Sequence, residues 1–206
     1  MENKTHWEQI YTTKATTQVS WYQEHAQLSF AFIQQTGVGK HGQIIDVGGG
    51  ASTLVDDLLA EGYSQVTVLD ISAAALSTAQ QRLGPLAERV IWLEADITQA
   101  DLPHHFYDIW HDRAVFHFLT QAEDRQQYVE RVRQAVRPGG HVIVATFADD
   151  GPLQCSGLDV VRYNPDSLHA QFGSEFTLLH STREAHQTPF GTTQKFIYCY
   201  CRTYQA

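Results

Sequence analysis

The sequence has few cysteines, few basic residues and no long apolar stretch. Its three cysteines are an odd number, and Cys199 and Cys201 stand two apart on an expected strand, where they are poorly placed to bond each other. We therefore expect no disulfide framework and a reduced, cytoplasmic protein. No apolar run approaches the length of a bilayer span, and the first residues lack the pattern of a signal peptide. These absences predict a protein without a membrane partner.

Basic residues are scarce, since 14 Lys and Arg stand against 23 Asp and Glu and give a formal net charge of −9. No basic stripe compensates for this charge, which argues against a nucleic acid as the main partner. Small molecules and basic protein surfaces remain possible partners. The chain of 206 residues, with 43% hydrophobic residues, is long enough for one sizeable core and short for two. We expect a single domain over residues 1–206.

The sequence patterns of several enzyme classes are absent. No G-x-S-x-G elbow indicates a hydrolase, and neither an H-E-x-x-H nor a paired C-x-x-C pattern indicates a metal site. His111 and His117, with Asp112 between them, are spaced so that a metal site is geometrically possible. Because no other pattern supports such a site, we expect no metal.

Three consecutive glycines, Gly48 to Gly50, follow a short apolar run. Residues 44–47 predict a strand that is buried on both faces. Residues 54–61 predict a helix that ends at Gly62. Strand, glycine turn and helix form the opening of a nucleotide-binding βαβ unit, in which glycine lets the backbone bend and lets a ligand approach closely.

Three acids, Asp46, Asp70 and Asp96, lie at the carboxyl ends of successive expected strands. Open parallel sheets bind ligands along this edge, so the three carboxylates predict one ligand site. Asp70 also follows Gly48 by 22 residues. At that distance a carboxylate on the second strand reaches the ribose hydroxyls of a nucleoside.

The glycine turn differs from a dinucleotide fingerprint. The pattern G-x-G-x-x-G would need glycine or alanine at position 53, where the chain has Thr53. Asp46 would also repel a pyrophosphate. A nicotinamide-dependent oxidoreductase is therefore an alternative and not the main hypothesis.

Residues 46–52, Asp-Val-Gly-Gly-Gly-Ala-Ser, resemble the first motif of the class I S-adenosylmethionine-dependent methyltransferases, D/E-x-G-x-G-x-G, and depart from it at Ser52. Residues 137–140, Arg-Pro-Gly-Gly, are similar to the turn before the fifth strand of that family. The resemblance implies a doubly wound, Rossmann-like α/β sheet of seven strands in the order 3-2-1-4-5-7-6. A turn at Pro189 to Gly191 predicts a hairpin of the last two strands, which makes the last strand antiparallel.

The resemblance implies S-adenosylmethionine as the cofactor, whose ammonium and sulfonium suit a site with carboxylates. In the family, an acid at the position of Asp96 accepts a hydrogen bond from the adenine amino group, and its neighbour, here Ile97, packs on the ring. The segment that begins at His111 lines the methyl group. The complete set of expected cofactor contacts is Trp7, Tyr11, Asp46, Gly48, Gly49, Gly50, Ser52, Asp70, Ile71, Asp96, Ile97, His111 and Asp112.

Residues 1–27 are rich in aromatic side chains and lack a sustained core-facing pattern. In methyltransferases that resemble this chain, such a segment folds over the cofactor and carries a W-x-x-x-Y pattern like that of Trp7 and Tyr11. We therefore expect a cover over cofactor and substrate that orders on binding. The alternative is a short amphipathic helix that packs Trp7 and Ile10 on the domain.

The resemblance implies methyl transfer from S-adenosylmethionine to a nucleophile, and a small molecule is the expected acceptor. An N-P-P-Y/F tetrapeptide, which marks amino methylation of nucleobases, is absent, and residues 111–114 stand in its place. A lysine-type side chain on a protein is the alternative acceptor. A non-catalytic cofactor-binding subunit is a further alternative.

A general base is needed only if the acceptor is protonated at neutral pH. His111 and His117 are the candidates, because histidine titrates in that range. The alternative for His117 is a satisfied helix residue that points away from the site. Phe116, His117, the loop around Cys155 and the aromatic N-terminus predict an acceptor pocket with aromatic walls and few charges. We also expect Gly48→Val to abolish cofactor binding and to leave the domain folded.

Overall fold

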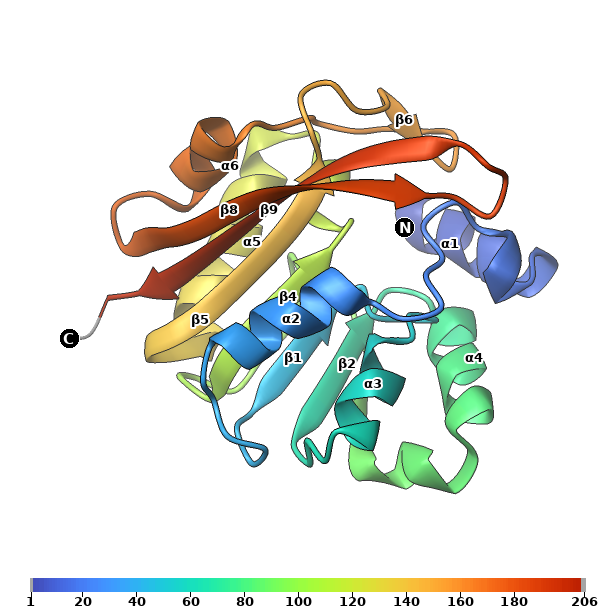
Figure 1. Cartoon of the computed structure of the whole chain (residues 1–206), viewed down its shortest axis with the longest axis horizontal. Coiled ribbons are helices and arrows are strands. Elements are labelled where there is room, and N and C mark those ends of the chain that lie inside the picture. Colours follow the sequence, from blue (N-terminus) through green and yellow to red (C-terminus); the bar gives the residue numbers. More distant parts are fainter. Residues whose placement is uncertain (1, 205–206) are drawn as a thin grey trace.

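The computed structural model describes residues 2–204, with side chains from Lys4 onward, so residues 1 and 205–206 of the expected domain lie outside it (Figure 1). A seven-stranded sheet has the order β3-β2-β1-β4-β5-β9-β8. Because β8 and β9 are its sixth and seventh strands along the chain, the predicted order 3-2-1-4-5-7-6 is confirmed. The strands are β1 (Ile44–Val47), β2 (Val66–Asp70), β3 (Val90–Glu94), β4 (Tyr107–Arg113), β5 (Val136–Phe147), β8 (Phe176–Gln187) and β9 (Thr193–Thr203).

The first five strands are parallel, and β9 pairs antiparallel with both β5 and β8. The predicted hairpin is confirmed, since residues 188–192 join β8 to β9 and Gly191 has a φ of +77°. Strand β8 runs from Phe176 to Gln187. Its second half is mostly polar, so hydrophobic alternation does not mark it.

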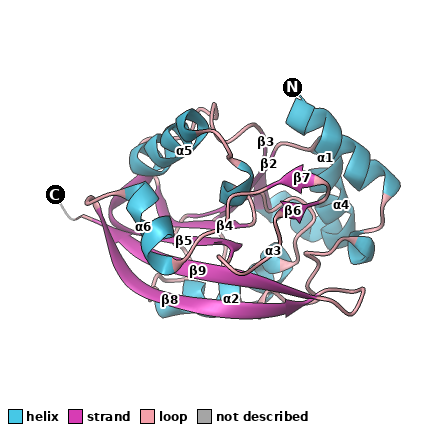
Figure 2. Cartoon of the chain, turned by 90° about the horizontal axis from the view of Figure 1, so that it is seen from above, coloured by secondary structure: helices cyan, strands magenta, loops and turns pink. Residues whose placement is uncertain are grey.

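Helices cover both faces of the sheet (Figures 1 and 2). One face carries α2 (Gln27–Gln35), α3 (Leu54–Ala60) and α4 (Ala73–Leu83), and the other carries α5 (Ala122–Ala135) and α6 (Pro165–Phe172). Alternating strand residues divide between two hydrophobic clusters, because successive side chains of a strand point to opposite faces. Ile44 and Ile109 face α2 and α3, whereas Ile45 and Trp110 face α5.

Capping side chains set the beginnings of two helices. Ser72 accepts a hydrogen bond of 3.1 Å from the Ala75 amide at α4, and Asn164 forms a reciprocal capping box with Ser167 at α6. At α3 the Ser52 hydroxyl accepts from the Leu54 amide at 3.2 Å.

The sequence predicted a separate turn at residues 137–140, before the fifth strand. The structure has no separate turn there. The segment is the beginning of β5, which follows α5 directly at Val136. Gly139 has a φ of +75°, and the pairing of β4 with β5 shifts register between Tyr107 and Ile109. The Pro-Gly-Gly sequence therefore makes an irregular strand start, because glycine tolerates the left-handed backbone there.

Most of the remaining elements surround the carboxyl ends of the parallel strands, whereas the 3-10 turn at Gly84–Arg89 leads directly into the beginning of β3 at the opposite edge. The remaining elements are α1 (Glu2–Thr13), three 3-10 turns at Thr16–Gln18, Gly84–Arg89 and Phe116–Phe118, and the small hairpin of β6 (Gln154–Cys155) and β7 (Leu158–Asp159). Helix α1 lies beside α4 (Figure 1). Within residues 2–204, no helix combines the length and apolar character that crossing a bilayer requires.

Candidate functional site

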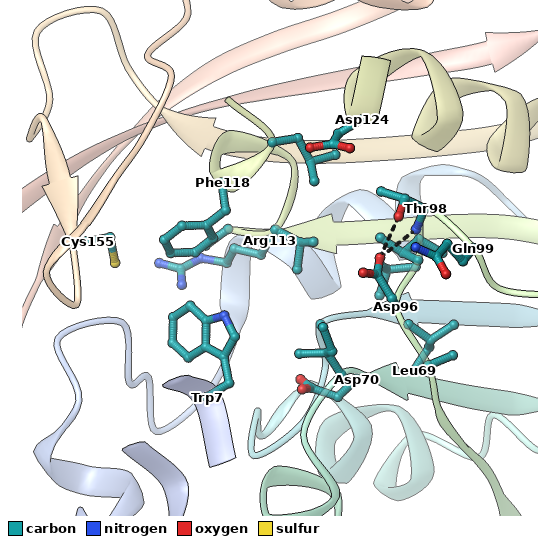
Figure 3. Close-up of a pocket in the computed structure, with 18 of the residues that line it drawn as sticks. Trp7, Leu69, Asp70, Asp96, Thr98, Gln99, Arg113, Phe118, Asp124 and Cys155 are labelled. Carbon is teal, nitrogen blue, oxygen red and sulfur yellow. Dashed lines mark hydrogen bonds between the residues drawn. The ribbon is translucent and has the colours of Figure 1, made fainter. Parts of the chain in front are cut away.

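A cavity of about 320 Å³ lies at the carboxyl ends of β1, β2 and β4 (Figure 3). One end is formed by the end of β2 and the loop after β3. The other end is formed by α1, the turn after β4 and the β6–β7 hairpin. Its lining consists of Trp7, Tyr11, Trp21, Val47, Gly48, residues 69–71, residues 95–99, residues 113–115, Phe118, Leu119, Asp124 and Cys155.

A second cavity of about 50 Å³ adjoins the first, between residues 16–29 and the glycine turn. The two cavities share Tyr11, Trp21, Gly48 and Arg113. Six of the expected contacts, Tyr11, Asp46, Gly48, Gly49, Ser52 and His111, line the small cavity. The expected contacts that line the large cavity are Trp7, Tyr11, Gly48, Asp70, Ile71, Asp96 and Ile97.

Asp46 and His111 form a buried pair at the floor of the small cavity. They are neighbours because β1 and β4 pair in register at these two positions. Asp46 Oδ1 and His111 Nδ1 are 2.7 Å apart, and both side chains are 3% exposed. Asp46 Oδ2 and His111 Nε2 have no hydrogen-bond partner within the described chain. Since an unpaired buried polar atom is costly, both atoms are suited to a polar ligand.

Asp70 ends β2 at the wall of the large cavity. Its Oδ1 accepts a hydrogen bond of 2.9 Å from the Ser72 amide. Burial raises the pKa of this carboxyl to about 7, and the negative charges of Asp46 and Glu8 act in the same direction. The carboxyl is therefore poised to titrate near neutral pH.

Asp96 lies beyond the end of β3 and begins the far wall of the large cavity (Figure 3). Its Oδ1 accepts the amide of Thr98 at 3.0 Å and the hydroxyl of the same residue at 2.7 Å. These bonds orient the carboxylate and leave Oδ2 free of a recorded bond. The three acids thus come to one edge of the sheet, as the strand ends predict.

Two glycines of the turn are required by the protein's own side chains. A Cβ at Gly49 would overlap the Asp46 carboxylate, and a Cβ at Gly50 would overlap the Asp70 carboxylate and crowd Ala75. Gly50 lines neither cavity. Its closest neighbour in the described chain is the Asp70 carboxylate, on which it packs.

Helix α1 is fastened to the domain by a residue that the sequence did not single out. The Glu8 carboxylate accepts the amides of Ala73 at 2.6 Å and Ala74 at 3.2 Å, and so caps α4 from outside. Lys4 forms an ion pair with Glu94. No local pattern marks Glu8, because its partners are 65 residues away.

The fastened helix places Trp7 in an aromatic group at one end of the large cavity. Its ring centroid lies 5.1 Å from that of Phe118 and 5.7 Å from that of Trp21, both in edge-to-face geometry. Tyr11 accepts a hydrogen bond of 3.3 Å from the Trp21 indole. A helix therefore packs on the domain and Trp7 and Tyr11 line the cavity, while ordering of the segment on binding stays a prediction.

Arg113, at the end of β4, lines both cavities and was missed by the sequence reasoning. Its side chain is 10% exposed and forms an ion pair of 3.1 Å with Glu184. It also donates to the Tyr198 hydroxyl at 3.1 Å and to the Trp21 carbonyl at 3.3 Å. An arginine at the end of a buried strand was the available signal, because such a charge needs partners.

Asp112 lines neither cavity, and its carboxylate is used by the protein itself. Its carboxylate accepts the amides of Val115 at 2.8 Å and Phe116 at 3.1 Å, and the hydroxyl of Tyr128 at 2.6 Å. Burial raises its pKa to about 6. Successive residues of β4 face opposite sides of the sheet, so His111 and Asp112 cannot both face the same cavity.

His117 also lines neither cavity. Its Nδ1 accepts a hydrogen bond of 3.2 Å from the Phe147 amide, and the residue is fully buried. Burial and the nearby charge of Arg113 lower its pKa to about 3. His117 is therefore a neutral, buried residue outside the lining of both cavities.

The hydroxyl of Tyr128 links β4 to α5 through Asp112 and the Trp110 indole, which donates to it at 2.9 Å. We expect Tyr128→Phe to lower the free energy of unfolding by about 1.5–3 kcal/mol, because it removes a buried hydrogen bond to a carboxylate. Tyr163→Phe is the matched control, since its buried hydroxyl has no partner in the described chain. Urea unfolding of both variants tests this. Equal losses in the two variants would show that the hydrogen bond from Tyr128 to Asp112 adds no stability.

The three cysteines are free and buried. Cys155 lines the large cavity, and burial raises the pKa of its thiol to about 12, so it is protonated at neutral pH. Among the described residues, histidine, cysteine and carboxylate side chains form no group of three or more that could hold a metal ion.

Comparison with known proteins identifies relatives of this chain. A family model described as a methyltransferase domain matches residues 44–140. An uncharacterized methyltransferase of Mycobacterium tuberculosis is 36% identical over 104 residues, which cover 50% of this chain and 50% of that protein. The chain thus spans about half the length of the curated relatives it matches first.

Two solved structures share the fold over nearly the whole chain. An S-adenosylmethionine-dependent methyltransferase from Anabaena variabilis has a TM-score of 0.76 at 16% identity and covers 98% of this chain and 96% of its own. The N-methyltransferase NodS from Bradyrhizobium japonicum, solved in complex with S-adenosylhomocysteine, has a TM-score of 0.72 at 14% identity and covers 98% of both chains. At these identities the likeness shows the fold.

Proposed function

Because residues 44–140 form a methyltransferase domain of the class I S-adenosylmethionine-dependent type, we propose that this protein transfers a methyl group from S-adenosylmethionine to a small-molecule nucleophile. The observation that carries the proposal is the meeting of Asp46, Asp70 and Asp96 around two adjoining cavities at the carboxyl edge of the sheet. A cytoplasmic location belongs to this proposal.

The residues present fit the cofactor. Asp70 would hold the ribose hydroxyls, and Asp96 with Ile97 would hold the adenine. Asp46, which lines the small cavity and has a buried, unpaired Oδ2, suits the cationic amino-acid end. When bound, S-adenosylmethionine supplies an electrophilic methyl group on a sulfonium.

The chain's own contribution is alignment and the exclusion of water. Trp7, Trp21 and Phe118 wall one end of the large cavity with aromatic surface, and Cys155 closes it from the β6–β7 hairpin. Holding two reactants in near-attack geometry is worth roughly 7–11 kcal/mol of the barrier. Walls from both α1 and the hairpin favour a small acceptor over a lysine side chain on a folded protein.

Isothermal titration calorimetry with S-adenosylmethionine, S-adenosylhomocysteine and NAD tests the cofactor. We expect the first two to bind and NAD not to bind. Binding of NAD alone would overturn the proposal in favour of an oxidoreductase. Product detection against a metabolite panel then separates an enzyme from a non-catalytic subunit, which would bind the cofactor and methylate nothing.

His111 faces the small cavity, so we expect His111→Ala to weaken binding of S-adenosylhomocysteine by about 10- to 100-fold, the worth of a hydrogen bond to a charged group. At saturating cofactor the methyl-transfer rate should stay within about tenfold. His104→Ala, which removes an exposed histidine, is the control. A rate loss of about 10²–10⁴-fold together with loss of the pH dependence near neutrality would instead make His111 the general base.

The segment 1–27 remains our proposed cover. Lys14 is exposed just after α1, so trypsin should cut there quickly without ligand and slowly with S-adenosylhomocysteine. Glu8→Ala, which removes the contact with α4, should speed cleavage of the free protein. Equal cleavage with and without ligand would show that the segment is a fixed part of the domain.

A further inference from the structure

The acceptor end of the large cavity combines aromatic walls with one cation. Figure 3 shows the Arg113 side chain at the same end as Trp7, Phe118 and Cys155, while Asp96, Thr98 and Gln99 lie at the opposite end. A guanidinium in a largely apolar wall is a strong binding group, because little water competes for it.

Arg113 has binding capacity that the protein does not use. A guanidinium has five N–H donors, and the described residues accept three hydrogen bonds from it, at Tyr198, Trp21 and Glu184. Two N–H groups therefore remain for another acceptor. The Phe196 ring, 4.3 Å from the guanidinium carbon, covers one of its faces.

The charges around Arg113 leave room for an anion. Glu184 is its ion-pair partner, and the carboxylates that line the large cavity, Asp70, Asp96 and Asp124, form no recorded bond with it. The other titratable groups that face it are Tyr198 on β9, His186 on β8, His117 and Cys155. All four are uncharged at neutral pH, because burial lowers the pKa of both histidines and raises that of the thiol and the phenol.

The thiol and the phenol at the acceptor end are poor bases. Cys155 keeps its proton, and burial raises the pKa of the Tyr11 hydroxyl well above its usual value. His117 lies outside the lining, and His111 opens into the small cavity. Neither this thiol nor this phenol can therefore receive a proton from a nucleophile near neutral pH.

We propose that the acceptor is a small aromatic compound whose nucleophilic atom is bound as an anion, a thiolate or phenolate, with its charge held by the free N–H groups of Arg113. This inference rests on the proposed function. The bond that forms joins the anionic sulfur or oxygen to the methyl carbon. The bond that breaks joins that carbon to the sulfonium sulfur, which keeps the electron pair, so no proton moves in the step.

Binding of unreactive probes tests the anion site without turnover. Calorimetry on the protein saturated with S-adenosylhomocysteine should show benzoate binding at least about tenfold more tightly than benzamide, its neutral counterpart of the same shape. Glu184→Gln removes the competing carboxylate and preserves the shape of the side chain. This variant should tighten benzoate binding by about three- to tenfold and leave benzamide unchanged. Equal binding of the two probes in both proteins would overturn the proposal.

Activity on three simple acceptors completes the test. Thiophenol and 4-nitrophenol should be methylated, with a rate that rises with pH as each acceptor ionises, and benzylamine should not. Arg113→Lys should keep part of this activity, and Arg113→Met should lose about 10²-fold or more while S-adenosylhomocysteine still binds. Methylation of benzylamine in preference to thiophenol would overturn the anionic acceptor and leave the proposed function standing. Absence of S-adenosylhomocysteine binding to the unaltered protein would instead refute the proposed function.

Discussion

Replacing Gly48 by valine should destabilise the fold as well as block the cofactor. Gly48 has a φ of +67°, and a Cβ built there would overlap a methyl group of Val115. A β-branched residue at this φ costs about 1–2 kcal/mol, and overpacking costs about 1–3 kcal/mol more. For a chain of this size, the sum lowers the melting temperature by about 4–20 °C. The sequence predicted that Gly48→Val would leave the domain folded. We now expect a loss of stability, because Val115 occupies the space that the valine side chain would need.

A second pair of variants separates the two effects. Val115→Ala creates space for a Cβ, so Gly48→Ala combined with Val115→Ala should recover much of the stability measured by thermal unfolding. Val115→Ala alone is the control. If the double variant is stable and does not bind S-adenosylhomocysteine, the ligand itself needs the space beside Gly48. If the stable double variant binds S-adenosylhomocysteine as tightly as the unaltered protein, Gly48 does not contribute to the cofactor site.

Binding of S-adenosylhomocysteine should weaken as the pH falls below about 7, because ribose hydroxyls donate to an ionised Asp70. With the pKa of this carboxyl raised to about 7, affinity at pH 5.5 should be about 30-fold lower than at pH 8. Isothermal titration calorimetry between these two pH values measures the affinity. Asp70→Asn should bind weakly at every pH and should lose the pH dependence, whereas Asp96→Asn should bind weakly and keep it.

Ionisation of the same carboxyl should strengthen cofactor binding but lower the stability of the ligand-free protein. The ordinary pKa of 3.8 applies to Asp70 in the unfolded chain, and the folded chain holds the proton up to about pH 7. Between these values the folded state binds more protons than the unfolded state, so the free energy of unfolding of the ligand-free protein falls as the pH rises. A pH-independent affinity, together with a pH-independent difference in stability between Asp70→Asn and the unaltered protein, would show that Asp70 does not titrate in this range.

The sequence by itself determined the sheet and the edge at which the proposed cofactor site lies. Local patterns mark each parallel strand and the glycine turn, and the chain order of strands and helices allows few topologies. Asp46, Asp70 and Asp96 could be placed together because the ends of parallel strands meet at one edge. The alternation rule could also have separated His111 from Asp112, since neighbours on β4 face opposite sides of the sheet.

Only the tertiary structure decided which polar groups are available to a ligand. Glu8 caps a helix 65 residues away, and Asp112 is used by the turn that follows its own strand. Neither role has a sequence signal, because both depend on which buried groups lack another partner. Arg113 became a candidate for the acceptor end only when Tyr198, Trp21 and Glu184 were seen to leave two of its donors free. Hydrogen-bond capacity is shared among residues distant in the chain, so it is determined by the folded arrangement and not by local sequence.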